Sequence, residues 1–327
     1  MQPNLKEIAE KLGISSSTVS RALRDHPRIA AATKARVKAA LKEYGYQLDP
    51  IVSTGMSRIR KRTFYRETIA WCGDCPPKDM PWLKSFFKSL DEYGLRLGYK
   101  VEHYNLLKAS KRELNQLTRT WEARGIRGIL LGPFSHNRPP LRFAWDNFAW
   151  VSVGHAPDKP TLHSVGRNYE LDIKNALIWL RQNEYHRPCF ILDPEVAHIF
   201  KEPLLSAALM FQRNHPNACP EPYFELSDNG GHDFDDWFNR NRPDCVILPR
   251  MLQPHSPVVA FKLKTLKQVY LSPPTRSTRP KGPYFCARYD MIGRVAVAML
   301  HLHLSDSEFG LPDCQQVVKL NSTWTLD

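Results

Sequence analysis

Apolar positions in the first 44 residues recur with the period of an α-helix. One predicted helix ends at Gly13 and has an apolar face made of Leu5, Ile8, Ala9 and Leu12. Ser15 can cap a second short helix. The segment from Lys34 to Tyr44 predicts a third helix, whose inward side chains are Val37, Ala40 and Leu41. Two short helices joined by a tight turn and covered by a third are typical of a helix-turn-helix unit.

From Glu67 onward the pattern changes to short apolar runs separated by amphipathic helices. The runs are TIAWCG (68–73), GIRGILLGPF (125–134), FAWVSVGH (148–155), RPCFILD (187–193), DCVILPR (244–250) and KQVYLSP (267–273). Apolar strands that alternate with helices predict an α/β fold, with parallel sheets covered by helices on both faces. The chain therefore combines a small all-α domain with a much larger α/β domain.

The distribution of charge along the chain indicates what the protein binds. The 327 residues have a net charge of +13, and the first 62 residues alone hold 13 Lys and Arg against 5 Asp and Glu. A basic excess concentrated on a helix-turn-helix unit is the electrostatic footprint of nucleic-acid binding. No run of 18 apolar residues and no basic-then-apolar leader follows Met1, so we expect a cytoplasmic protein without a membrane segment.

The seven cysteines form a poor disulfide framework because their number is odd and their spacing is wide. Two of them lie in the box Trp71-Cys72-Gly73-Asp74-Cys75, which has the spacing of a thioredoxin redox turn. Pro76 and Pro77 follow directly and delay the helix that would acidify the first thiol. We interpret the box as a loop at a pocket rim or core, and a thiol sensor stays open as an alternative.

The stretch LKEIAEKLGISSSTVSRALRDHPRIAAATKARVKAALKEYGY, residues 5–46, resembles the DNA-binding headpiece of the lac and galactose repressor family without a gap. The resemblance implies that the second helix lies in the major groove of DNA. It places Ser16, Ser17 and Arg21 at base-reading positions, and Arg21 can bind a guanine edge bidentately. The remaining implied DNA contacts, mostly to phosphates, are Ser15, Thr18, Ser20, Arg24, Arg28, Thr33 and Tyr46.

The resemblance extends into a hinge. In the family a linker after the headpiece becomes helical on DNA, and paired leucines wedge into the minor groove. Here that position falls on Gly55, so we expect Met56 to take over the wedge; a flexible basic linker is the alternative. The third helix also departs from the family pattern, because Ala stands where a Ser or Thr cap is usual, at a cost of about 1 kcal/mol.

The α/β part resembles the two-lobed, periplasmic-binding-protein-like effector domain of the same family. The implied organisation is a headpiece (1–47), a hinge (48–65) and an effector-binding and dimerisation domain (66–327). Within that domain, lobe one would comprise about 66–162 and 280–308, and lobe two about 163–279 and 309–327. Ligands of such folds bind at the carboxyl ends of the strands.

The candidate effector-binding residues are Cys72, Asp74, Phe134, Ser135, His155, Arg167, Lys201, Arg250 and Ser272. Where sugar-binding relatives have an Arg, an Asn-Asp pair and two further Asp residues, this chain has Lys201, Arg250-Met251, Ser272 and Arg167. Fewer acceptors and more cations favour an anionic or aromatic ligand over a neutral sugar. Several aromatic residues could stack on a ring or belong to the core: Trp71, Trp82, Phe134 and Trp145.

The implied function is that of a transcriptional repressor, a homodimer that binds a pseudo-palindromic operator under control of a small molecule. Two alternatives keep the DNA binding: a regulator without an effector or with a protein partner, and a DNA binder indifferent to sequence. The histidines form no HExxH helix, and GxSxG and phosphate-loop motifs are missing, so we expect neither catalysis, a cofactor nor a metal. The C-terminal sequence has no leucine-heptad tail, so we expect a dimer rather than a tetramer.

Overall fold

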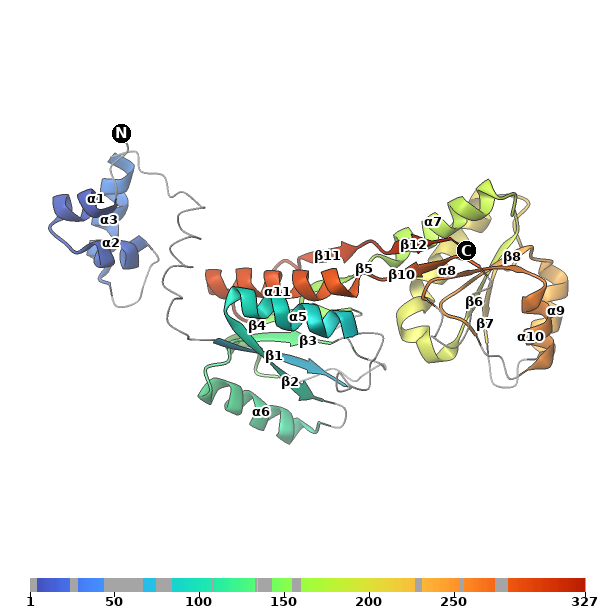
Figure 1. The fold of residues 1–327 in the computed structure, drawn as a ribbon, viewed down its shortest axis with the longest axis horizontal. Helices are drawn as coiled ribbons and strands as arrows, with labels where there is room; N and C mark the ends of the chain where they lie inside the picture. Colours follow the sequence, from blue (N-terminus) through green and yellow to red (C-terminus); the bar gives the residue numbers. More distant parts are fainter. Residues whose placement is uncertain are drawn as a thin grey trace. The chain divides into compact units, whose positions relative to one another are not determined.

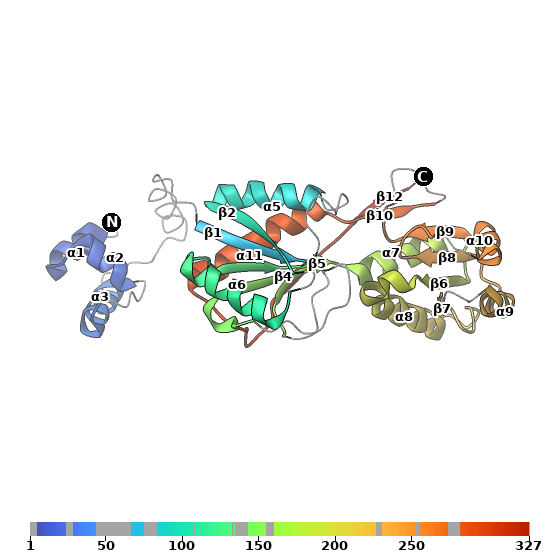
Figure 2. The same ribbon diagram turned by 90° about the horizontal axis from the view of Figure 1, so that it is seen from below.

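The structure of the protein is a computed structural model, shown in Figures 1 and 2. It describes residues 5–23, 29–43, 67–74, 84–106, 109–132, 134, 143–154, 160–226, 231–252, 256–273 and 282–326. The chain divides into two compact units, Met1–Tyr65 and Arg66–Asp327. Among the described residues, no helix has the length and apolar content that a membrane crossing requires.

The N-terminal unit is the predicted helix-turn-helix domain. Its helices are α1 (Leu5–Leu12), α2 (Ser16–Leu23) and α3 (Ala31–Glu43). Gly13 has a φ of 66°, which lets α1 end in a tight turn, and the Ile14 N–H donates to the Ala9 carbonyl at 3.0 Å. The core contains Ile8, Ala9, Val19, Ala22, Val37 and Ala40. Each helix therefore contributes apolar residues that its sequence period places inward, whereas the side chains of Leu5 and Leu41 lie outside the described part of the structure.

The larger unit contains a first sheet of six parallel strands in the order β11-β5-β4-β3-β1-β2. Its strands are β1 (Glu67–Gly73), β2 (Tyr99–Asn105), β3 (Gly128–Leu131), β4 (Ala149–Val153), β5 (His163–Arg167) and β11 (Val317–Leu320). Its helices are α5 (Lys84–Leu97), α6 (Lys111–Ala123) and α11 (Tyr289–Asp306), with a short turn of 3₁₀ helix, η3 (Trp145–Asn147).

Successive residues of β1 point to opposite faces of this sheet, as the pleat requires. Ile69 and Trp71 pack with residues of α5 and α11, whereas Ala70 and Cys72 pack with residues of α6. Figures 1 and 2 accordingly show α5 and α11 side by side over one face and α6 over the other. Burial on both faces explains why the central strands of this sheet are continuous apolar runs.

A second sheet has the order β12-β10-β9-β8-β6-β7, parallel except for the pairing of β10 with β12. Its strands are β6 (Pro188–Leu192), β7 (Tyr223–Glu225), β8 (Cys245–Leu248), β9 (Lys267–Tyr270), β10 (Tyr284–Cys286) and β12 (Thr323–Thr325). Its helices are α7 (Tyr169–Gln182), η4 (Pro194–Val196), α8 (Ala197–Asn214), α9 (Gly231–Asn241) and α10 (Pro257–Lys264). Helices α7 and α8 pack on one face, and α9 and α10 on the other.

The strands distribute between the two sheets differently from the expected lobe boundaries. Strands β5 and β11 were expected in lobe two, but β5 pairs with β4 and β11 pairs with β5, so both extend the first sheet. Strand β10 was expected in lobe one, yet it pairs with β9 in the second sheet. The chain therefore passes from one sheet to the other after β5, after β10 and after β11. Backbone pairing, which local sequence does not encode, sets these boundaries.

Close packing of α11 on α5 depends on a glycine. A Cβ added at Gly293 would lie 2.8 Å from the Phe86 carbonyl oxygen, a backbone atom that cannot rotate away. Gly293→Ala is therefore expected to lower the free energy of unfolding by about 1–3 kcal/mol, measured by urea denaturation. Gly94→Ala in α5 is the matched control, because its Cβ would lie 3.1 Å from a side-chain methyl of Val101 and no nearer than 3.7 Å to the backbone oxygen of Tyr99. Equal losses of unfolding free energy in the two variants would contradict the close approach to the Phe86 carbonyl oxygen as the cause.

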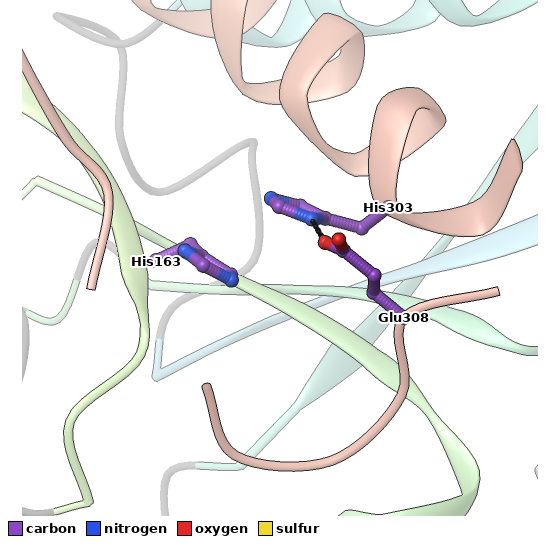
Figure 3. Close-up of side chains that lie close together, drawn as sticks. All are labelled: His163, His303 and Glu308. Carbon is purple, nitrogen blue, oxygen red and sulfur yellow. Dashed lines mark hydrogen bonds and ion pairs between the residues drawn. The ribbon is translucent and has the colours of Figure 1, made fainter. Parts of the chain in front are cut away.

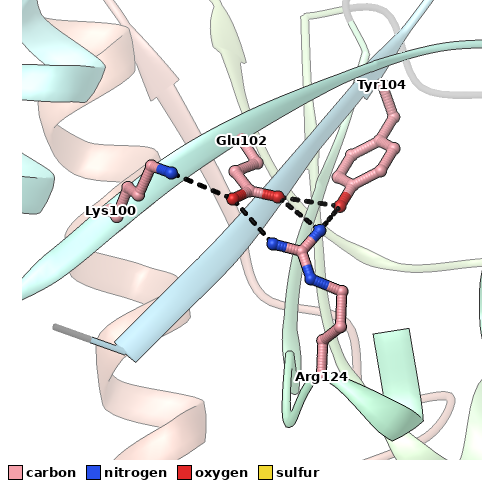
Figure 4. Close-up of polar contacts among 4 residues, drawn as sticks. All are labelled: Lys100, Glu102, Tyr104 and Arg124. Atoms are coloured by element: carbon pink, nitrogen blue, oxygen red, sulfur yellow. Dashed lines mark hydrogen bonds and ion pairs between the residues drawn. The ribbon is translucent and has the colours of Figure 1, made fainter. Parts of the chain in front are cut away.

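Edge strand β2 carries a polar network on its exposed side, shown in Figure 4. The Arg124 guanidinium, just after α6, lies 2.8 Å from the Glu102 carboxylate, which also accepts from Lys100 at 3.1 Å and from the Tyr104 hydroxyl at 3.0 Å. The hydrogen bond from Arg124 is the main cause that lowers the pKa of Glu102 to about 2. The ionised carboxylate thus joins the edge strand to the end of α6.

Because the pKa of Glu102 is lower in the folded chain than in the unfolded one, this network stabilises the fold above about pH 4.3. That stabilisation is lost as the pH falls toward 2. Glu102→Gln is therefore expected to flatten the dependence of unfolding free energy on pH between about 4.5 and 2, measured by urea denaturation at each pH. Glu92→Gln removes the same charge from an exposed helix position and should leave the slope as in the unmodified chain.

Candidate nucleic-acid interface and effector site

The turn of the N-terminal unit presents the start of α2 through a local hydrogen-bond motif. The Ser15 Oγ accepts from the Thr18 N–H at 3.2 Å, and the two hydroxyls lie 2.8 Å apart. Ser15 is thus the N-cap of α2, as its position in the sequence predicts. The Arg36 guanidinium donates to the Leu12 carbonyl at 3.3 Å, so α3 is also connected to the end of α1. These hydrogen bonds fix the position of the first turn of α2 within the N-terminal unit.

The structure describes the predicted DNA contacts unevenly. Ser16 is exposed at the first position of α2, Thr18 is half-buried, and Thr33 is half-buried in the first turn of α3. Residues 17, 20 and 21 belong to α2, but their side chains lie outside the described part of the structure. Four further predicted contacts also lie outside the described residues: Arg24, Arg28, Tyr46 and Met56.

The start of α3 offers a test of headpiece stability. The helix begins at Ala31, and the Lys34 N–H donates to the Ala30 carbonyl, so exposed Ala30 occupies the N-cap position and has no side-chain oxygen. Ala30→Ser is expected to stabilise the headpiece by about 1 kcal/mol, measured as a roughly fivefold increase in hydrogen-exchange protection of α3 amides in the full chain. Ala35→Ser, at an exposed position inside α3, should instead lower protection slightly. A gain in both variants would contradict capping as the cause.

Three of the candidate effector residues, which lie on or after β1 and β3, are buried. Cys72 lies on β1 with its side chain in the core, and Phe134 belongs to the same apolar cluster. Asp74, immediately after β1, is fully buried. Burial raises the pKa of the Cys72 thiol well above its usual range, the opposite of what a reactive thiolate needs. The other two candidates of this region, Ser135 and His155, and Cys75 lie outside the described residues.

Each predicted effector cation is held by a carboxylate of the same chain. The Arg167 Nε donates to Asp172 at 2.6 Å, and both side chains are buried. Lys201 lies 2.9 Å from Glu225 at the end of β7. Arg250 follows β8 and lies 2.5 Å from both Asp193, which follows β6, and Glu195. The positive charges of Arg167, Lys201 and Arg250 are therefore largely neutralised in the fold by carboxylates that the sequence did not indicate.

These carboxylates were not predicted from the sequence. Asp172 stands five residues after Arg167 in the first turn of α7, a spacing that could have indicated the pair. Asp193 stands 57 positions before Arg250, and only the adjacency of β6 and β8 brings their ends together. Ser272, which follows β9, is half-buried.

The aromatic candidates are core residues wherever the structure describes them. The Trp71 ring meets Phe87 edge to face at 5.0 Å, and its Nε1–H donates to the Gly132 carbonyl at 2.6 Å. Trp145 packs on Trp150 with ring centroids 4.6 Å apart. Trp82 lies outside the described residues. Aromatic stacking on a ligand therefore has little support from the described side chains.

The N-terminal unit is similar in sequence to a known family of regulators. Residues 4–49 match the family described as "Bacterial regulatory proteins, lacI family". The HTH-type transcriptional regulator AglR of Rhizobium meliloti (strain 1021) is 53% identical over 47 residues, which are 14% of this chain and 13% of that regulator. The matched segment is thus a small part of either protein.

Two solved structures are similar over far more of the chain. A putative lacI-family transcriptional regulator from Rhizobium etli has a TM-score of 0.58 at 12% identity, covering 80% of this chain and 98% of that one. A lac repressor dimer bound to operator and the anti-inducer ONPF has a TM-score of 0.53 at 14% identity, covering 99% and 98%. At such identities the similarity shows the fold, a helix-turn-helix headpiece joined to a two-lobed α/β domain.

Proposed function

We propose that this chain, whose residues 4–49 match the lacI family of bacterial regulatory proteins, represses transcription from a specific operator. The observation that carries the proposal is the capped helix α2. Buried Val19 and Ala22 define its inward face, and the helical period puts positions 17, 20 and 21 on the face away from them. A basic headpiece then brings this face to the phosphate backbone.

The proposed DNA contacts are those implied by the family resemblance. Arg21, with Ser16 and Ser17, reads base edges in the major groove, and the neighbouring hydroxyl and basic residues hold phosphates. Two copies of the chain present two headpieces to a pseudo-palindromic operator, since a two-fold dimer requires two related half-sites. The hinge at 48–65 follows the headpiece, with Met56 as the proposed minor-groove wedge. The similar lac repressor is itself a dimer bound to operator. A DNA-bound regulator of this kind acts in the cytoplasm.

We further propose an effector site at the carboxyl ends of the strands, with an anionic ligand favoured over a neutral sugar. The support is at Arg167, whose Nη2 is buried and has no partner among the described residues, although its Nε is held by Asp172. That nitrogen retains a donor for a carboxylate or phosphate. Arg250 and Lys201 would share a ligand with their existing carboxylates. Lobe closure around the ligand would then change the spacing of the paired hinges and the affinity for DNA.

A control mechanism without a metabolite is the second candidate. The cations at the effector positions already have protein carboxylates, which is the arrangement expected if a cleft has lost its ligand. In that case the α/β domain would serve dimerisation or a protein partner. Redox control through Cys72 is a weaker candidate, because burial raises its pKa and opposes thiolate formation.

The proposal is tested in two steps with the full chain. Selection from random duplex DNA followed by footprinting should give one site with two inverted half-sites; protection without a common sequence would overturn specific binding. Thermal melting against sugars, sugar acids, phosphosugars, nucleobases and aromatic acids should then show an upward shift with the anionic compounds. A shift with neutral sugars alone would contradict the anionic assignment, and no shift at millimolar concentration would favour control without a metabolite.

A further inference from the structure

Two histidines and a glutamate that the sequence analysis left without a role meet in the first sheet region, as Figure 3 shows. His163 is the first residue of β5, His303 lies near the end of α11, and Glu308 follows that helix. The two imidazole rings stack with centroids 4.0 Å apart and planes 11° apart. One potential ligand atom from each residue lies within 4.8 Å of those of the other two.

The end of α11 explains the position of Glu308. Ser307 adopts the left-handed conformation, with φ 60°, and the Glu308 N–H donates back to the His303 carbonyl at 2.9 Å. This turn brings the Glu308 carboxylate to within 2.5 Å of the His303 Nδ1. The carboxylate accepts the Nδ1 proton, so in the neutral form of the ring the lone pair lies on Nε2. A carboxylate–histidine pair of this kind orients the ring and makes Nε2 a better metal ligand.

The His303 Nε2 is the second observation that points to a ligand. The residue is 1% exposed, and among the described residues Nε2 has no hydrogen-bond partner. A buried acceptor without a partner is destabilising, so such an atom indicates a partner of another kind. His163 faces it across the stack and is half-buried. The His163 Nδ1 accepts the Gln316 N–H at 3.1 Å, so this nitrogen carries a lone pair that could serve a metal ion instead.

We propose that His163, His303 and Glu308 form a binding site for a divalent transition-metal ion, of which Zn²⁺ is the representative probe. Imidazole nitrogen with a carboxylate suits zinc, nickel and cobalt rather than magnesium or calcium. His303 Nε2 is one ligand, Glu308 positions it, and a ring nitrogen of His163 is the second. Since a lone pair lies in its ring plane, His163 turns out of the stack to bind, releasing the Gln316 N–H that its Nδ1 accepts at 3.1 Å. Water completes the coordination.

Binding would connect segments that are distant in the sequence. The Gln316 carbonyl accepts from the Ser164 N–H at 2.9 Å, so the segment entering β11 already lies along the start of β5. An ion held by His163 and His303 would add the end of α11 to this pair. Because the ion binds only the folded arrangement, it stabilises the α/β unit by a free energy that grows with the logarithm of its concentration above Kd.

The test uses the full chain without a purification tag, treated with chelator and titrated with ZnCl₂ by calorimetry and by thermal melting. We expect one Zn²⁺ per chain and a rise in Tm that MgCl₂ does not reproduce. His163→Gln should weaken binding at least about tenfold, and Glu308→Gln, at a largely exposed side chain, by roughly 10- to 100-fold. His186→Gln replaces an exposed histidine of the second sheet region and should bind as the unmodified chain does.

The absence of stoichiometric Zn²⁺ binding by the unmodified chain would overturn the proposal. So would equal affinities in the His163→Gln, Glu308→Gln and His186→Gln variants, because the ion would then bind elsewhere. Circular dichroism of each variant checks that its fold is retained. Glu308→Gln keeps the test decisive if His163→Gln does not fold, since the Glu308 side chain is 58% exposed.

Discussion

Replacing Asp172 with alanine is expected to lower the free energy of unfolding by about 3–5 kcal/mol. The Asp172 and Arg167 side chains are only 1% and 4% exposed, and the Arg167 Nε donates to the carboxylate at 2.6 Å. The Ser322 hydroxyl donates to the same oxygen at 2.7 Å. Removing the carboxylate leaves a buried guanidinium without its counter-charge, and arginine cannot lose its proton to escape this cost. Urea denaturation followed by circular dichroism measures the effect.

Two comparisons isolate the buried charge as the cause. Glu170→Ala, two residues earlier in α7, removes an exposed ion pair with Lys319 and should change stability by less than about 1 kcal/mol. The double replacement Arg167→Met with Asp172→Leu removes both charges, and most of the stability should return. A double variant as unstable as Asp172→Ala would show that the pair acts through shape and not through charge. If it folds, it also separates stability from effector binding, because it lacks the proposed anion donor of Arg167.

The strands that the sequence predicts are those buried on both faces. The run around β1 has five consecutive buried residues, and β3, β4, β6 and β8 are buried throughout, so each appears as an unbroken apolar segment. Strand β2 was not predicted, because it lies at the sheet edge and its residues after buried Tyr99 are exposed or half-buried. Strand β11 leaves Val317 half exposed and is recognisable only from its pairing with β5.

The candidate sites also differ in how much of each the sequence predicts. The headpiece was predictable because its helices, its turn at Gly13 and its cap at Ser15 depend on residues close in sequence. The effector cations were predictable as residue types, but their electrostatic state was not. Glu225 reaches Lys201 of α8 from the end of strand β7, and Asp193 reaches Arg250 across two parallel strands. The His163–His303 stack joins residues 140 positions apart, so no motif in the sequence could indicate it.

Replacing Arg21 with alanine is expected to reduce the ratio of operator to random-duplex affinity at least about thirtyfold. A bidentate arginine–guanine contact supplies about 1–3 kcal/mol of discrimination, and a dimer loses two such contacts, hence at least about 2 kcal/mol. Arg21 is the sixth residue of α2, at a helical position away from the inward face that Val19 and Ala22 define. Equilibrium binding of the full chain to both duplexes, at one fixed salt concentration, gives the ratio.

Arg24→Ala is the matched control, because it removes the same side chain from a position that the family resemblance assigns to phosphate. Its affinity should fall by a similar factor for operator and random duplex, with a shallower salt dependence and an unchanged ratio. If Arg21→Ala behaves in the same way as Arg24→Ala, Arg21 contacts phosphate and base reading must come from Ser16 and Ser17. Hydroxyl groups pair with almost any base edge, so the operator would then be recognised mainly through its shape.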